Sequence, residues 1–99
     1  MPVTKEFIEK VAADTGITID KLPVSGLLAL LQEKRRKIMI DKLEIFSRYD
    51  VVSLDELEKK IKDGKIPEHP AWEDLILLEN LEASLALINE DIKTLQRSS

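Results

Sequence analysis

Aliphatic residues recur along the last third of the chain at alternating steps of three and four positions. This spacing is the a/d rhythm of a helix that lies along another helix. We therefore expect a long helix from about Pro70 to Gln96, with a ridge that must be hidden against a second helix. The ridge, called the seam from here on, consists of Leu78, Leu81, Leu85, Ile88, Ile92 and Leu95.

A second long helix is predicted from about Gly26 to Arg48 or Tyr49, with Ser25 as its N-cap. The same rhythm runs along it, and the two long helices can lie antiparallel within the chain. Its inner stripe consists of Leu28, Leu31, Arg35, Ile38, Lys42, Ile45 and Tyr49.

Two cations, Arg35 and Lys42, stand in this stripe where apolar residues are expected. A buried unpaired cation is strongly destabilising, so each needs a carboxylate or a place at the rim. Glu79, Glu82 and Asp91 flank the seam and are the expected partners. Two cations within a stripe can also specify register or partner choice.

The first short helix is expected from about Lys5 to Thr15, capped by Thr4 and ended by Gly16. The connector that follows, residues 17–24, can make one short turn of helix at 18–21. We expect Pro23 to stop that turn, because the residue before a proline avoids the helical region.

The second short helix carries the clearest local signal in the chain, a capping box. Ser53 can accept from the amide of Glu56, and the Glu56 carboxylate can reach back to the amide of Ser53. Val52 and Leu57 are spaced as a hydrophobic staple, and the helix should end at Asp63. Gly64 then supplies the left-handed position, Pro67 blocks continuation, and Pro70 suits the first turn of the last helix.

These elements predict an all-α fold with four helices in the order short, long, short, long, and with two long antiparallel amphipathic helices. The 99 residues are expected to form a single helical domain, 1–99. The sequence is 43% hydrophobic but only 4% aromatic, so the core must be aliphatic.

Charge divides the chain into unequal halves. Residues 1–49 hold nine Lys/Arg and seven Asp/Glu, whereas residues 50–99 hold six and twelve. The acidic second half suits a basic partner or the basic patch of the first half, and it argues against general nucleic-acid binding. No secretion signal, membrane span or cysteine is visible, so we expect a cytoplasmic protein that binds no membrane.

No motif predicts catalytic, cofactor-binding or metal-binding residues, and no cofactor is expected. The cationic run Lys34–Lys37 can touch phosphates, but Glu33 and Asp41 are spaced to pair with Lys37, which is typical of a solvated helical face. His69 has no cysteine or second histidine as a companion and is interpreted as a polar helix-entry residue. Trp72 is interpreted as a core anchor against the second short helix, with an interface hot spot as the alternative.

A family resemblance covers the stretch from Tyr49 to Glu82. Its features are a tyrosine that closes a long helix, a short helix that ends in glycine, and the acidic, tryptophan-containing segment Glu68-His69-Pro70-Ala71-Trp72-Glu73-Asp74-Leu75. The stretch resembles small helical proteins of prokaryotic, often archaeal, toxin–antitoxin-type gene pairs. The first half departs from the usual antitoxin plan, because no short strand or helix-turn-helix unit precedes the long helix.

The resemblance implies a non-enzymatic protein–protein interaction module that masks a partner protein, such as a small toxin-like protein. The expected contact residues are the seam, with Glu79, Glu82 and Asp91 at its rim and Arg35 and Lys42 as specificity residues. The alternative is a self-assembling scaffold homodimer, which would use the seam on a second copy.

Overall fold

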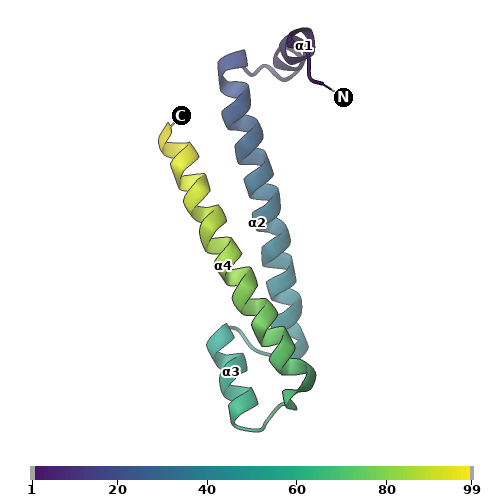
Figure 1. Ribbon diagram of the computed structural model, residues 1–99, viewed down its shortest axis with the longest axis vertical. Helices are drawn as coiled ribbons and strands as arrows, with labels where there is room; N and C mark the ends of the chain where they lie inside the picture. The colour runs from purple at the N-terminus through teal and green to yellow at the C-terminus, as the bar shows by residue number, and fades with distance from the viewer. Residues whose placement is uncertain (1, 99) are drawn as a thin grey trace.

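The computed structural model describes residues 2–98, and within them it contains helices and no strand. The all-α fold class is therefore confirmed. The elements are α1 (Lys5–Thr15), the 3₁₀ turn η1 (Ile19–Lys21), α2 (Leu22–Tyr49), α3 (Leu54–Lys62) and α4 (Glu68–Ser98) (Figure 1).

The two long helices, α2 and α4, lie side by side and antiparallel (Figure 1). Three polar contacts show their register. Arg48 Nη1 lies 2.8 Å from Asp74 Oδ2, and Lys42 Nζ lies 3.6 Å from Glu82 Oε1. Arg35 Nε donates to Asn89 Oδ1 at 2.9 Å. From one contact to the next, the α2 residue moves toward the start of its helix, and its partner moves by a similar number of residues toward the end of α4.

The four expected helices are present in the expected order, but they do not all pack together. Three helices, α2, α3 and α4, pack together, whereas α1 contacts mainly η1 at the far end of α2. The result is an elongated molecule of 61 × 29 × 19 Å. Its radius of gyration is 19.5 Å, against about 13 Å for a compact domain of this length.

The start of α2 also differs from the prediction. Helix α2 begins at Leu22, four residues before the expected start at Gly26, and Pro23 lies in its first turn. The first turn of a helix has no internal acceptors for its N–H groups, so the missing N–H of a proline is harmless there. The short helical turn expected at 18–21 is present as η1.

Helix α4 is bent at its beginning. His69 has non-helical dihedral angles (φ −113°, ψ 126°), and the His69–Pro70 peptide bond is cis. The continuous part of α4 therefore begins at Pro70, as predicted. It then runs beside α2 toward the end of the molecule that holds α1 (Figure 1).

Within residues 2–98, the seven buried hydrophobic residues all lie between positions 45 and 78, at the end of the rod that holds α3; this is called the closed end. They are Ile45, Val51, Leu57, Ile61, Ala71, Leu75 and Leu78. Leu57, Leu75 and Leu78 have almost no exposed surface, and burying a leucine stabilises a fold by about 2 kcal/mol. The core is aliphatic, as the composition requires.

Local contacts fix the turn that leads into α3. Ser53 Oγ accepts from the Glu56 amide at 3.1 Å, which confirms one half of the capping box. The Glu56 carboxylate accepts from the amide of Val52 at 3.0 Å, not from that of Ser53. The prediction of a hydrophobic staple is wrong, because Val52 is 84% exposed and the preceding Val51 is buried instead.

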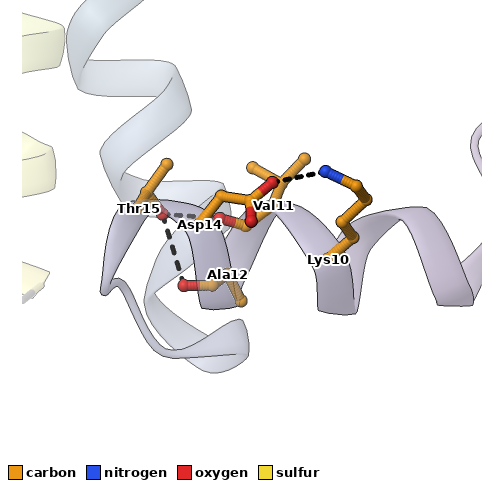
Figure 2. Close-up of polar contacts among 5 residues, drawn as sticks. All are labelled: Lys10, Val11, Ala12, Asp14 and Thr15. Atoms are coloured by element: carbon orange, nitrogen blue, oxygen red, sulfur yellow. Dashed lines mark hydrogen bonds and ion pairs between the residues drawn. The ribbon is translucent and has the colours of Figure 1, made fainter.

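The opposite end of the rod, called the open end, holds α1, the start of α2 and the end of α4 (Figure 1). It contains none of the buried hydrophobic residues. Within the described part of the chain, the side-chain hydrogen bonds of α1 all stay inside it or its cap. Thr4 caps Phe7 at 3.2 Å, Lys10 pairs with Asp14 at 2.6 Å, and Thr15 donates to the Val11 carbonyl at 2.7 Å (Figure 2).

No helix in residues 2–98 combines the length and the apolar character that crossing a bilayer requires.

Candidate protein-binding surface

The seam faces α2 in the same chain. Leu78 is fully buried, and the other five seam residues are partly buried. Its counterpart on α2 behaves alike: Ile45 is buried, while Leu28, Leu31 and Ile38 are partly buried. Helix α2 thus occupies the place in which a partner was expected, and another protein can reach only the parts of the seam that α2 leaves uncovered.

The two cations of the inner stripe lie between the helices and have different partners. The Lys42 side chain is only 14% exposed; its ammonium lies beside Glu82 and 5.8 Å from the centre of the Phe46 ring. Arg35 stays exposed and binds the Asn89 amide oxygen instead of a carboxylate. Both contacts fix the register of the long helices within the chain.

The three rim carboxylates have different environments. Glu82 pairs with Lys42, as predicted. Among the residues the structure describes, no ion pair engages Glu79 or Asp91. These two carboxylates are exposed and available to another molecule.

A shallow groove lies between the start of α2 and the end of α4. It brings two predicted site residues, Asp91 and Leu95, together with residues that the prediction did not include. The groove is lined by Leu27, Leu30, Leu31, Asp91, Thr94 and Leu95. Leu27 and Leu30 are 52% and 55% exposed, so this part of the interhelical surface is left open.

A second apolar surface runs along α4 and consists of residues spaced by three or four positions. This outer stripe is formed by Trp72, Ile76, Ala83 and Leu87 with the carboxylate Glu79 in its middle, all of them exposed. The interpretation of Trp72 as a core anchor is wrong: its side chain is 47% exposed, and the neighbouring Ala71 is buried instead. An apolar face on both sides of α4 is visible in the sequence, but the pattern does not show that only one side is covered.

The cationic run Lys34–Lys37 is exposed along its whole length. Glu33 pairs with Arg36 at 2.7 Å, whereas the sequence predicts a pair with Lys37. A hydrogen bond from Arg36 lowers the pKa of the Glu33 carboxyl from its usual value. His69 is also exposed and lies 3.3 Å from the Glu73 carboxylate, at the bend that the sequence assigns to it.

A polar cluster at the closed end fastens the end of α2 to α4. The Tyr49 hydroxyl donates to the Asp74 carboxylate, which also accepts from Arg48 at 2.8 Å. Burial, helped by the adjacent Asp74 carboxylate, raises the pKa of the Tyr49 hydroxyl. Within residues 2–98, no group of three or more His, Asp or Glu side chains is placed to hold a metal ion. These polar contacts join helix α2 to helix α4.

Comparison with known proteins places the chain in a family. Residues 1–99 match the family described as "Uncharacterized protein MJ0235 family". The chain belongs to the MJ0235 family. Its relative MJ0235 from Methanocaldococcus jannaschii, described as "Uncharacterized protein MJ0235", is 28% identical over 81 residues. That alignment covers 82% of this chain and 99% of the relative.

No solved structure matches the chain. The relative is archaeal, but neither match links the family to the toxin–antitoxin gene pairs that the resemblance of residues 49–82 implies.

Proposed function

We propose that this protein is a non-enzymatic protein-binding module, and that it binds and masks a basic surface of a partner protein with the outer stripe of α4. The antitoxin-like role implied by the resemblance of residues 49–82 is the specific form of this proposal. The observation that carries it is the exposure of Trp72, Ile76 and Leu87 along one face of helix α4.

The chemistry of this face supports a protein partner. Tryptophan is among the residues that contribute most to binding at protein interfaces, and an exposed row of apolar side chains is typical of interaction sites. Because α4 carries seven acidic and two basic residues, the surroundings of the stripe are negative. A basic amphipathic helix is the partner that this face complements best.

Co-expression with the product of the adjacent gene tests the proposal. We expect a stoichiometric complex from the wild-type chain and a blue shift in the emission of Trp72, its only tryptophan. Trp72→Ala should weaken the complex at least about ten-fold. Leu43→Ala, which truncates an exposed leucine on the other long helix, is the matched control and should bind normally. A complex that Trp72→Ala leaves intact, or no complex at all, would overturn the proposal.

The alternative function, a self-assembling scaffold homodimer, draws support from a different surface. The groove at the open end is lined by residues outside the outer stripe. Self-association there leaves Trp72 and Ile76 accessible, so the two roles are compatible.

A further inference from the structure

The chain exposes more surface than a monomer of its mass normally does. A compact monomer of 11.3 kDa exposes about 5,700 Å², whereas this chain exposes 7340 Å². The excess is about 1,600 Å², and a permanent homodimer buries about 1,000 to 2,500 Å² on each subunit. The missing burial is therefore of the size that one second copy would supply.

This uncovered surface includes the open end. The groove there has an apolar floor, formed by Leu27, Leu30, Leu31 and Leu95. Helix α1 lies at the same end and presents a second apolar groove, which Phe7, Ile8 and Val11 line together with η1 and the start of α2. No residue of α1 is buried.

Charge indicates which helix can cover this groove. Helix α2 carries six basic and three acidic residues, a balance of +3, whereas α4 carries two and seven, a balance of −5. An α4 from outside the chain therefore suits α2, and an α2 from outside suits α4. A second copy of this chain supplies both an α4 and an α2.

We infer that a second copy of this chain covers the open end, related by a two-fold axis parallel to the rod. This symmetry places α2 of each copy antiparallel to α4 of the other copy, at the same level as its own α4, and it makes one self-complementary interface. A two-fold axis that lies in the interface but runs perpendicular to the rod would instead bring the two basic α2 helices together. The dimer is a bundle in which every neighbouring pair of helices joins one basic and one acidic helix.

One pair of opposite charges, Lys34 and Asp91, is brought together between the copies by this two-fold arrangement. Because Arg35 binds Asn89, Lys34 lies level with the stretch 89–91 of α4. No ion pair engages Lys34 or Asp91 in the described part of the chain, and Asp91 lines the groove. In the dimer, Lys34 of each copy faces Asp91 of the other copy. This interface does not involve the outer stripe, so the inference does not rest on the proposed function.

Sedimentation velocity of the full chain tests the inference at concentrations from about 1 to 100 μM. We expect a monomer–dimer equilibrium for the wild type. Leu30→Glu should shift it to monomer, because it places two charges in the interface, while circular dichroism remains helical since Leu30 is already 55% exposed. Leu43→Glu is the matched control, an equally drastic change at a 60% exposed site of the same helix, and should dimerise as the wild type does.

Charge reversal then tests the geometry. Lys34→Glu and Asp91→Lys should each weaken the homodimer about ten-fold, since each places two like-charge pairs in it. An equimolar mixture of the two variants should form a heterodimer with nearly wild-type affinity, because both pairs then have opposite charges. A wild type that stays monomeric at 100 μM, a dimer that Leu43→Glu abolishes while Leu30→Glu leaves it intact, or a mixture that associates no better than its components would overturn the inference. None of these results affects the Trp72 test.

Discussion

The closed and open ends of this molecule are built on the same pair of helices with the same heptad spacing, yet among residues 2–98 only those at the closed end form a buried core. At the closed end α3 packs against α4, and Leu57, Leu75 and Leu78 are almost completely buried. At the open end α1 contacts mainly η1, and Leu31 and Leu95 stay partly exposed. Two helices hide only the facing line of a heptad ridge, so a third element is needed to bury its flanks.

The largest difference between the two ends should appear when one aliphatic side chain is truncated at each. Leu57→Ala removes a fully buried side chain of α3 and should lower the free energy of unfolding by about 3–5 kcal/mol. Ile92→Ala, at a partly buried seam position, should cost less than about 2 kcal/mol. Urea unfolding at about 1 μM, followed by circular dichroism, measures both without a contribution from association. Equal costs would mean that the open end is as well packed as the closed end.

The second-largest effect on the free energy of unfolding is expected at the Tyr49 hydroxyl. Tyr49→Phe removes a hydrogen bond to the Asp74 carboxylate and should lower the free energy of unfolding by about 1.5 kcal/mol at pH 7. Because the folded state raises the pKa of Tyr49, the folded protein holds this proton more tightly than the unfolded chain does. The stabilisation is therefore complete below the unfolded pKa of about 10 and is lost as the pH rises through the folded value. Wild type and variant should converge in stability above pH 10, and a constant difference up to pH 11 would contradict this assignment.

The two N-caps form a matched pair, one at each end. Ser53 caps α3 and Thr4 caps α1, each by accepting from the amide three residues on. Ser53→Ala should cost about 1 kcal/mol of global stability. Thr4→Ala should leave the global unfolding transition unchanged, because α1 contacts mainly η1 and is expected to unfold separately from the core. A similar shift of the urea midpoint in both variants would show that α1 belongs to the cooperative unit.

The smallest effect is expected at Lys42, between the two ends. Its ammonium is largely covered but pairs with Glu82, which is itself accessible to water. Lys42→Leu restores an apolar residue at this heptad position and should raise the free energy of unfolding by less than about 1 kcal/mol. A decrease in the urea midpoint would instead show that the ion pair with Glu82 contributes net stability.

Much of the fold could be predicted from the sequence, because heptad spacing and caps are local properties of a helix. The long helices, the Ser53 cap and the glycine after α3 follow from such signals. The pairing of Lys42 with Glu82 could also be predicted, since a cation in a buried stripe requires a nearby carboxylate.

What the sequence did not predict depends on tertiary packing. Pro23 is compatible with both the end and the first turn of a helix, and only the path of the chain decides between them. Trp72 and Ala71 are adjacent on a helix that is apolar on two sides, and the position of α3 decides which one is buried. The undocked α1 has an ordinary amphipathic pattern, and its spacing carries no information on where its apolar face is covered.

Amide hydrogen exchange measured as a function of protein concentration tests the central claim most directly, namely that the open end is completed by a second copy. At about 1 μM, amides in residues 54–78 should be protected, while those in 5–31 and 88–95 should exchange much faster. At about 100 μM, protection in 22–31 and 88–95 should rise while that in 54–78 stays constant. Strong protection of the open end at the lower concentration, or no change there on a hundred-fold increase in concentration, would contradict the account.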